Sequence, residues 1–417
     1  MNEKQNLRLK RNVGLDYVHT FLSNMNMQSS IWVLYLAYCG LHLAQIGLLE
    51  GIYHATSIVC EIPSGAAADL WGRKRCMILS NICIAVSCVI MLFSKSFGWF
   101  AVSFVVQALG NNLNSGSEEA LVYDSMKCLG QEEHYMGVYG RLNVLIEVAQ
   151  GLATVAGGVL AELSYFWCYA ACVVIAVLAL LPVLWMAEPP QCGEAADTAG
   201  GSVEAAAEGA PAQRTIWEAV KHHFAVSACI LQKDARIGKI IGFYSVVFAA
   251  HTLLFFYSQQ YFADLGYNKV QISVIMLLVG GASCLGALAS EKMYRRFGKR
   301  CLILETVIIA AAILCYGSGK AGVAAAALMC AGFANAALYP IQSDSLNALI
   351  PSEQRATLIS VDSMCFSIAM IVLFPLAGAF ADRWGLKTVL LLLGAILLLF
   401  LLAAFCIEKE SFSSDHS

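Results

Sequence analysis

The sequence predicts an all-α integral membrane protein with twelve transmembrane helices in two six-helix bundles. Three observations predict this fold. Of the 417 residues, 59% are hydrophobic and only 13% are charged, whereas soluble domains carry about 25% charged residues. The apolar residues gather in runs that approach or exceed the roughly 20 residues needed to cross a bilayer. The two halves of the chain also repeat one another in sequence.

Twelve apolar runs are expected to span the membrane, with both termini in the cytoplasm. Their approximate limits are 15–38, 45–67, 76–94, 98–121, 136–161, 165–187, 238–260, 268–290, 301–318, 321–343, 356–381 and 386–407. In this topology 20 Lys and Arg residues lie on the side of the termini and 5 on the other. Because cytoplasmic loops are enriched in Lys and Arg, the split orients the protein. The polar, basic start of the chain is not followed by a small-residue cleavage site, so no cleaved signal peptide is expected.

The repeat divides the chain into two halves joined by a linker. A shift of 220 residues places Asp124 on Asp344 and the segment 158–162 on 378–382. Parallel six-span repeats with a substrate site between them are a known transporter plan. The Ala- and Gly-rich stretch after Pro190 has the composition of a tether. The expected domains are an N-terminal six-helix bundle over 1–187, a cytoplasmic linker with an amphipathic helix over 188–237, and a C-terminal bundle with a short tail over 238–417.

A charged turn between the second and third spans carries the most specific pattern. Gly, Asp, Gly and a basic pair recur there at fixed spacing, at Gly65, Asp69, Gly72, Arg73 and Lys74. This spacing resembles the signature loop of the major facilitator superfamily of transporters. The resemblance implies two bundles that rock about a central cavity, with this loop as a cytoplasmic gate. Within that gate Asp69 is expected to pair with basic residues and with the N-terminus of span 11, whose helix dipole favours an acid.

Polar residues inside the spans predict which helices line the cavity. A charge within a span costs about 2.5–3.5 kcal/mol, so its position reports function. Spans 3, 6 and 12 have no charge in their interiors and are expected to face lipid, whereas polar stripes at helical spacing mark the others. The predicted proton and substrate cavity comprises Glu50, His54, Glu61, Asn111, Ser115, Glu118, Glu119, Asn143, Glu147, Gln150, Tyr244, His251, Asn335, Tyr339 and Gln342.

The acids are the expected proton carriers, because a carboxylate in a low dielectric takes up a proton more readily. Glu147 and Glu50 lie deepest, and either could instead be a structural carboxyl bonded between helices. Glu61 also fits helix-end packing. The two histidines fit either a proton relay or plain packing, and the aromatic face of span 7 fits either substrate stacking or helix packing.

Two further residues are expected in the conformational gate. Arg141 opens span 5 and needs an acidic partner; the acids near it by topology are Glu61, Asp69, Glu118 and Glu119. Asp362 lies one or two turns into span 11 and is a candidate partner for Arg73.

The residues of spans 4 and 5 indicate which branch of the superfamily this chain resembles. Small residues from Gly140 to Gly158 resemble a degenerate form of the helix 5 motif of proton-coupled drug exporters, with Thr154 in place of the proline. Span 4 lacks the arginine that many members carry there, so any relay must use Glu50, Glu147 or a histidine. The stretch 115–124 resembles bacterial members labelled drug or tetracycline-type exporters.

The predicted function is therefore proton-coupled efflux, by antiport, of small amphipathic molecules such as drugs across a bacterial cytoplasmic membrane. Uptake of a nutrient such as a sugar or amino acid is the alternative, and a non-transporting receptor or scaffold is a remote one. Zinc-protease, nucleophile-elbow and phosphate-loop motifs are absent, so no enzyme is expected. The 16 cysteines lie mostly within spans and show no ligand spacing. The expected partners are a small-molecule substrate, a coupling proton or sodium ion, and the lipid bilayer. No nucleic acid, metal or cofactor is expected, and the protein is expected to be a monomer.

Overall fold

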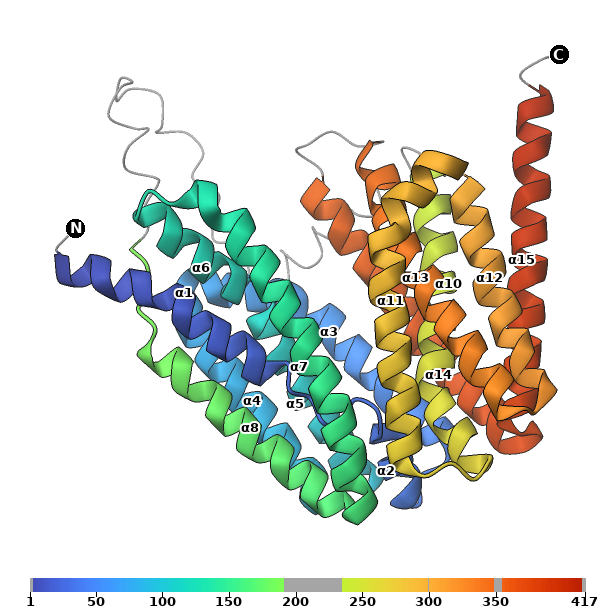
Figure 1. Ribbon diagram of the computed structural model, residues 1–417, viewed down its shortest axis with the longest axis horizontal. Helices are drawn as coiled ribbons and strands as arrows, with labels where there is room; N and C mark the ends of the chain where they lie inside the picture. The colour runs from blue at the N-terminus through green and yellow to red at the C-terminus, as the bar shows by residue number, and fades with distance from the viewer. Residues whose placement is uncertain (1–2, 191–234, 299, 349–354, 415–417) are drawn as a thin grey trace. The chain divides into compact units, whose positions relative to one another are not determined.

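The computed structural model describes residues 3–190, 235–298, 300–348 and 355–414, and these form helices joined by short connections (Figure 1). The first half contains α1 (Glu3–Ser23), α2 (Trp32–Tyr38), α3 (Leu43–Trp71), α4 (Arg73–Phe93), α5 (Phe97–Asn114), α6 (Ser117–Cys128), η1 (Glu132–His134), α7 (Tyr135–Leu163) and α8 (Tyr165–Trp185). The second half contains α10 (Ala235–Asp264), α11 (Lys269–Phe297), α12 (Arg300–Cys315), η2 (Tyr316–Ser318), α13 (Ala321–Ala348), α14 (Arg355–Trp384) and α15 (Leu386–Ser414). The predicted amphipathic helix of the linker lies outside the described residues.

Eight helices among the described residues are long and apolar enough to cross a membrane: α4, α7, α8, α10, α11, α12, α13 and α14. These coincide with eight of the twelve predicted spans. The remaining four predicted spans correspond to α1 with α2, to α3, to α5 with α6, and to α15. Their membrane crossing stays a prediction, because these segments are broken, more polar, or apolar over a shorter described stretch.

Two of the predicted spans are broken rather than continuous. The run 98–121 divides at Gly116, whose φ of +76° lies in the left-handed region that favours glycine, and α6 begins at the next residue. The run 15–38 divides after Ser23, where the side chain of Asn24 donates to the carbonyl of Thr20 at 2.8 Å. Both breaks replace helix hydrogen bonds by local side-chain and turn contacts. Irregular backbone at membrane depth is tolerated where it is buried in protein or lines a polar cavity.

The charged turn after the second span is shorter than the sequence indicates. The run was expected to end near residue 67, but α3 continues to Trp71 and only Gly72 interrupts the helical path before Arg73. Gly72 has a φ of +91°, which explains why a glycine stands there. Gly65 lies inside α3 rather than in the turn, and a side chain there would meet nothing within 4 Å among the described residues.

Contacts divide the described chain into two compact units, considered separately below. Unit 1 comprises Met1–Gln28, Ala55–Ala153 and Phe166–Val226. Unit 2 comprises Ser29–His54, Thr154–Tyr165 and Ser227–Ser417. Within unit 1, α4 packs along α5, and α6 packs against α1 and α4. Within unit 2, α11 packs along α13, α12 against α13 and α15, and α10 against α14 (Figure 1).

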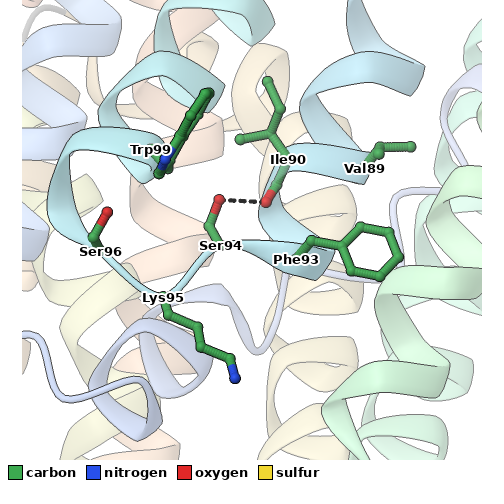
Figure 2. Close-up of a pocket in the computed structure, with 7 residues that line it drawn as sticks. All are labelled: Val89, Ile90, Phe93, Ser94, Lys95, Ser96 and Trp99. Atoms are coloured by element: carbon green, nitrogen blue, oxygen red, sulfur yellow. Dashed lines mark hydrogen bonds between the residues drawn. The ribbon is translucent and has the colours of Figure 1, made fainter.

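Unit 1 has an open pocket at the turn between α4 and α5 (Figure 2). It is lined by Val89, Ile90, Phe93, Ser94, Lys95, Ser96 and Trp99. Phe93 and Trp99 are 71% and 60% exposed, and aromatic residues beside a lysine are typical of a membrane–water boundary. This setting fits the predicted outer loop at Lys95 better than a buried ligand site.

Candidate functional site

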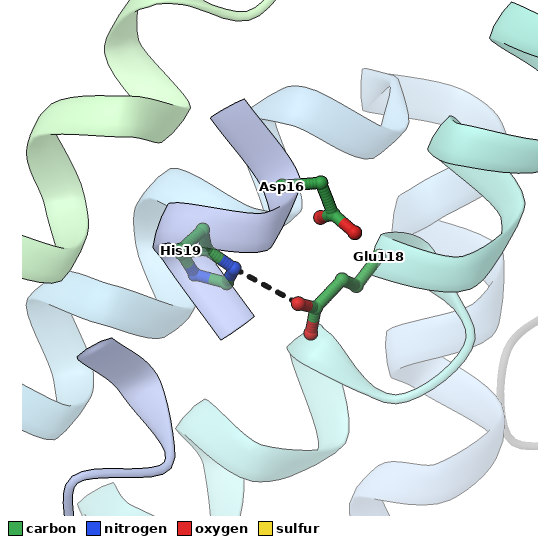
Figure 3. A group of neighbouring side chains, drawn as sticks. All are labelled: Asp16, His19 and Glu118. Atoms are coloured by element: carbon green, nitrogen blue, oxygen red, sulfur yellow. Dashed lines mark hydrogen bonds and ion pairs between the residues drawn. The ribbon is translucent and has the colours of Figure 1, made fainter. Parts of the chain in front are cut away.

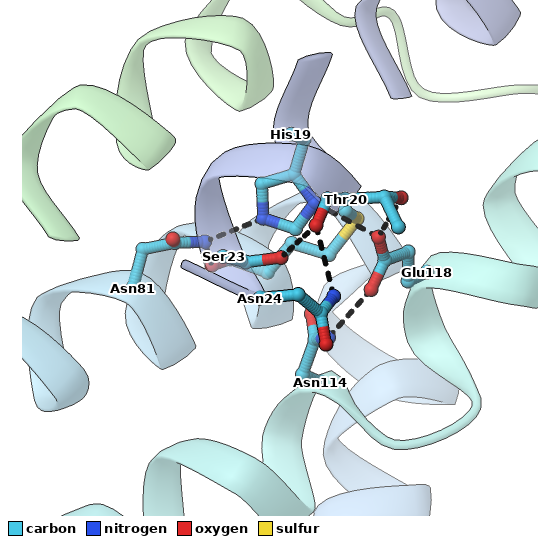
Figure 4. Close-up of polar contacts among 8 residues, drawn as sticks. His19, Thr20, Ser23, Asn24, Asn81, Asn114 and Glu118 are labelled. Carbon is cyan, nitrogen blue, oxygen red and sulfur yellow. Dashed lines mark hydrogen bonds and ion pairs between the residues drawn. The ribbon is translucent and has the colours of Figure 1, made fainter. Parts of the chain in front are cut away.

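A polar cluster in unit 1 joins α1 to α6 around the carboxylate of Glu118 (Figure 4). One oxygen, Oε1, lies 2.9 Å from His19 Nδ1 and accepts a hydrogen bond from Thr20 Oγ1 at 2.8 Å. The other, Oε2, accepts from Asn114 Nδ2 at 2.7 Å. Asn114 is the last residue of α5, so the helix break brings donor and acceptor together. Glu118 was a predicted cavity residue, and its three donors make it the centre of this cluster.

The far side of His19 is held by α4. Asn81 Nδ2 donates to the carbonyl of Met77 at 2.8 Å, which fixes this atom as the amide nitrogen. The same nitrogen lies 3.1 Å from His19 Nε2 (Figure 4). Since an amide nitrogen has only hydrogens to offer, Nε2 is the accepting nitrogen and the ring proton is on Nδ1, facing Glu118. The third span was expected only to face lipid, yet it supplies this contact through a buried asparagine.

Asp16 completes the cluster and was not singled out from the sequence. It lies one helical turn before His19 and is 1% exposed. Neither carboxylate oxygen has a hydrogen-bond partner among the described residues. Its carboxyl, the His19 ring and the Glu118 carboxyl have ligand atoms all within 4.8 Å of one another (Figure 3). The signal available in the sequence was an acid three residues before a histidine at the start of the first span.

The other predicted cavity residues of unit 1 lie at the surface of its helices. Glu61 on α3, Glu119 on α6 and Glu147 on α7 are exposed. Gln150 is exposed too, and it donates to Asn24 Oδ1 at 3.3 Å beside the break that follows α1. The remaining exposed members are Asn111, Ser115 and Asn143. Their lining of a shared cavity, and the role of Glu147 as a proton carrier, stay predictions.

In unit 2, Glu50 and His54 form the pair that their spacing predicts. His54 Nε2 lies 3.6 Å from Glu50 Oε1, and both side chains are 12% exposed. The other ring nitrogen, Nδ1, lies 3.2 Å from Ser367 Oγ on α14. The histidine therefore links α3 to α14 within this unit.

The predicted aromatic face of span 7 meets span 10 in unit 2. The ring centroids of Tyr244 and Phe248 on α10 are 6.3 Å apart, and those of Phe248 and Tyr339 on α13 are 5.9 Å apart. Tyr244 is 7% exposed and Tyr339 is 60% exposed. The row of rings therefore runs from the packed interior of the unit to its surface.

Two predicted polar residues on the same two helices have buried atoms without hydrogen-bond partners among the described residues. These are His251 Nε2 on α10 and Asn335 Oδ1 on α13. Leaving a buried polar atom unpaired costs about 1–3 kcal/mol, so such atoms call for a water or a ligand. Gln342, by contrast, is satisfied, because its Nε2 donates to Asp362 Oδ1 on α14 at 3.2 Å.

The signature turn is bound within unit 1. The carboxylate of Glu188 accepts from the backbone N–H groups of Arg73, at 2.7 Å, and Lys74, at 2.9 Å. It thus satisfies two free donors at the start of α4, where the helix dipole favours an anion. The side chain of Arg73 pairs with Asp124 on α6 and donates to the carbonyl of Ala120 at 2.6 Å. Glu188 is a partner that the sequence reasoning missed.

The remaining gate predictions concern Asp69, Arg141 and the pair of Arg73 with Asp362. Arg73 is engaged by Asp124 and Asp362 by Gln342, so a bond between Arg73 and Asp362 stays a prediction. Arg141 is exposed on α7 and forms no ion pair with another described side chain. Asp69 lies in α3, and its role as a gate is likewise a prediction.

Unit 2 contains a pair of matching contacts, called the twin caps below. Glu162 Oε2 on α7 accepts from the backbone N–H of Lys269, the first residue of α11, at 3.0 Å. Asp382 on α14 accepts from the backbone N–H groups of Leu43 and Ala44, the first residues of α3, each at 2.9 Å. Glu162 and Asp382 are the residues that the 220-residue shift superimposes. The sequence repeat therefore has a structural counterpart. Each of the two corresponding acids accepts hydrogen bonds from backbone N–H groups at the start of a helix.

Known proteins resemble this chain over most of its length. The family model described as Major Facilitator Superfamily matches residues 18–361 and 306–415. An uncharacterized MFS-type transporter, YxaM of Bacillus subtilis (strain 168), is 21% identical over 378 residues, which are 90% of each chain. Among solved structures, the nucleoside transporter NupG matches with a TM-score of 0.74 at 15% identity, over 98% of this chain and 100% of that one. A D-xylose-proton symporter matches with a TM-score of 0.63 at 15% identity, over 96% and 97%.

Proposed function

Since this chain belongs to the Major Facilitator Superfamily and is thus a multi-pass membrane transporter rather than an enzyme, we propose that it exports small amphipathic organic molecules in exchange for protons. It would work by alternating access, as a monomer in a bacterial cytoplasmic membrane. The proposal concerns the cargo, the direction and the coupling ion.

The observation that carries the choice of cargo is the row of rings on α10 and α13 beside unpaired polar atoms. Tyr244, Phe248 and Tyr339 offer aromatic faces in contact with one another. His251 Nε2 and Asn335 Oδ1 are buried without partners among the described residues of the same unit. A flat apolar body would stack on the rings, and a polar end would satisfy the histidine and the amide. An amphipathic molecule fits both requirements.

Uptake of a polar nutrient is the second candidate. The unpaired amide oxygen of Asn335 and the exposed hydroxyl of Tyr339 also suit a sugar or a nucleoside, which would bring several donors. Two transporters with this fold are named for a nucleoside and for D-xylose with a proton. The two candidates differ in the molecule that drives proton movement.

Proteoliposomes with a pH-sensitive dye inside distinguish them. A proton gradient is imposed, and lipophilic drugs, sugars, nucleosides and amino acids are added singly. Proton movement triggered by lipophilic cations or neutral drugs is the expected result. Movement triggered only by sugars, nucleosides or amino acids would replace export by uptake. Silence across the whole panel, with a folded protein, would argue against proton coupling.

Truncation of Tyr339 tests the aromatic contact. Tyr339→Ala should raise the KM for a transported drug by about fivefold to tenfold and leave kcat nearly unchanged, since an aromatic contact contributes about 0.5–1.5 kcal/mol. Phe93→Ala is the matched control, because Phe93 is also an exposed aromatic side chain but lies at the turn after α4. An unchanged KM in Tyr339→Ala, or an equal change in the control, would remove Tyr339 from the substrate site.

A further inference from the structure

We propose that Asp16 is the carboxyl that binds the coupling proton, and that Glu118 and His19 tune it. This inference rests on the proposed proton coupling but concerns a different residue from the acids that the sequence indicated. Four features of unit 1 support it: the burial of Asp16, the charge beside it, the tautomer of His19, and the helix breaks around it.

The burial of Asp16 is the first feature. It is 1% exposed, and both of its oxygens are without a hydrogen-bond partner among the described residues. An ionised carboxylate in such a place keeps neither water nor donors around it, so burial favours its neutral form. Figure 3 shows this carboxyl turned towards that of Glu118. Asp16 is thus a buried carboxyl that points into the cluster and receives no hydrogen bond from the described residues.

The second feature is that Glu118 is held as the negative partner. Its two oxygens receive contacts from three donors, His19, Thr20 and Asn114. It also stands in the first turn of α6, where the helix dipole stabilises an anion. The donors and the dipole favour the charge on Glu118, and that charge in turn favours a proton on Asp16. Two adjacent carboxyls in unlike surroundings are a recurring arrangement for separating a proton-binding acid from a permanent anion.

The third feature decides between a proton and a metal ion. The separation of the three groups would by itself admit a metal. However, the amide of Asn81 donates to His19 Nε2, which leaves the ring proton on Nδ1. Nδ1 is the nitrogen that faces Glu118, and a protonated nitrogen has no lone pair with which to bind a metal. The hydrogen-bond pattern therefore favours a neutral histidine that donates to Glu118 and leaves the proton to Asp16.

The fourth feature is the position of the cluster between two helix breaks. α1 ends at Ser23, two turns after Asp16, and the break between α5 and α6 falls just before Glu118. Discontinuous helices commonly form the ion sites of secondary transporters. Protonation of Asp16 removes the repulsion between α1 and α6, and its release restores it. The proton enters as H⁺ from water on one side and leaves to water on the other, so no further reactant is needed.

Other charged or titratable groups near Asp16 have to be considered in any pH measurement. Glu118 faces it from α6, Tyr135 on α7 interacts with it electrostatically, and His19 lies on its own helix. Of these groups, Glu118 is the one whose hydrogen bonds and helix position favour a negative charge. Substitution of Glu118 should therefore shift the titration of Asp16 towards lower pH, because the neighbouring negative charge is lost.

Infrared difference spectroscopy of the purified full chain tests the site without any substrate. The carboxylic acid C=O band is followed between pH 5 and pH 9. Wild type should show a titrating band that Asp16→Asn abolishes. Asp16→Asn is expected to fold, since the carboxyl makes no hydrogen bond that the amide would lose. Glu305→Gln is the matched control, because Glu305 is a buried carboxyl on α12 that also has no hydrogen-bond partner among the described residues.

Each outcome of the infrared measurement either supports or overturns the assignment of the coupling proton to Asp16. A band lost in Asp16→Asn, kept in Glu305→Gln and shifted to lower pH in Glu118→Gln supports the proposal. A band that survives Asp16→Asn overturns it. Stoichiometric binding of Mn²⁺ or Zn²⁺ to wild type that Asp16→Asn removes, measured by calorimetry with the metal alone, would also overturn it. If Glu118→Gln does not fold, Thr20→Val replaces it; this variant removes one donor from Glu118, which weakens the preference of Glu118 for its charged form, and should shift the band to lower pH by a smaller amount.

Transport assays distinguish a failure of the Asp16 assignment from a failure of the proposed proton-coupled function. In the proteoliposome assay, Asp16→Asn should lose substrate-driven proton movement but keep exchange of labelled for unlabelled substrate. Proton movement that persists in Asp16→Asn would contradict the site and leave proton-coupled transport intact. A titrating Asp16 band in a protein that moves no protons with any substrate would contradict the proposed function alone. Glu147→Gln, tested beside it, shows whether the acid that the sequence favoured has the role instead.

Discussion

Gly378→Leu should disable transport almost completely and lower the melting temperature of the purified protein. Gly378 on α14 packs against the start of α3, and a Cβ placed on it would overlap the backbone carbonyl of Leu43 and approach the hydroxyl of Tyr257 to 2.7 Å. Backbone atoms cannot move aside as a flexible side chain does. Overpacking of this kind costs about 1–3 kcal/mol, and a four-carbon side chain should be at the upper end. Transport should fall by roughly tenfold or more, since the cap that Asp382 forms at the start of α3 involves the same residue, Leu43.

Gly322→Leu is the matched control for this prediction. Gly322 lies near the start of α13, and a Cβ there would meet no atom of the described residues within 4 Å. This variant should keep more than half of the transport rate and melt like wild type, as measured by tryptophan fluorescence in detergent. If Gly378→Leu melted and transported as the control does, the contact between α14 and α3 would have no part in folding or in the transport cycle.

Glu118→Ala should strongly destabilise the protein. The substitution removes the acceptor of three hydrogen bonds, from His19, Thr20 and Asn114. His19 is 0% and Thr20 is 4% exposed, so water cannot readily replace the lost acceptor. Each buried donor left unpaired costs about 1–3 kcal/mol, and we expect a loss of about 3–5 kcal/mol. Thermal unfolding and detergent-resistant yield both measure it.

Glu119→Ala controls for the loss of an acid in the first turn of α6. Glu119 is the next residue and is exposed, so its truncation should change the melting temperature by no more than a degree or two, in line with small effects at the surface. Equal destabilisation by the two substitutions would mean that the helix dipole, and not the hydrogen-bonded cluster, accounts for the role of Glu118.

The helices could be predicted because their cause is local. An apolar run in a low-water environment must satisfy its own backbone, and a helix does so within one segment. Eight predicted spans therefore coincide with helices that qualify as spans. The breaks could not be predicted in the same way. Gly116 and Asn24 are each compatible with a continuous helix, and a break is stable only where other elements bind the backbone and side chains that it frees.

The contacts of the candidate sites also fall into two kinds: those set by spacing within one helix, and those set by the packing of distant segments. Glu50 and His54 meet because a spacing of four places them on one helical face, and so their pairing could be predicted. The partner of Arg73 could not, since Asp124 lies 51 residues away along the chain. Asp16 was missed because nothing in its neighbourhood in the sequence shows that its carboxyl is buried without a donor. That property depends on α6, which packs against α1 and brings Glu118 beside it.

The sequence by itself determined the membrane environment, the family, the repeat and most of the helices, because composition, hydropathy and periodicity act within single segments. It also determined that Glu162 and Asp382 correspond, though not what they do. Only the tertiary structure decided that these two acids cap helix starts, that Glu188 binds the signature turn, and that Asp16 faces Glu118. These features depend on atoms that the fold brings together from distant parts of the chain. At such places the charge of a side chain depends on its burial and on the donors that point at it, and not on its residue type alone.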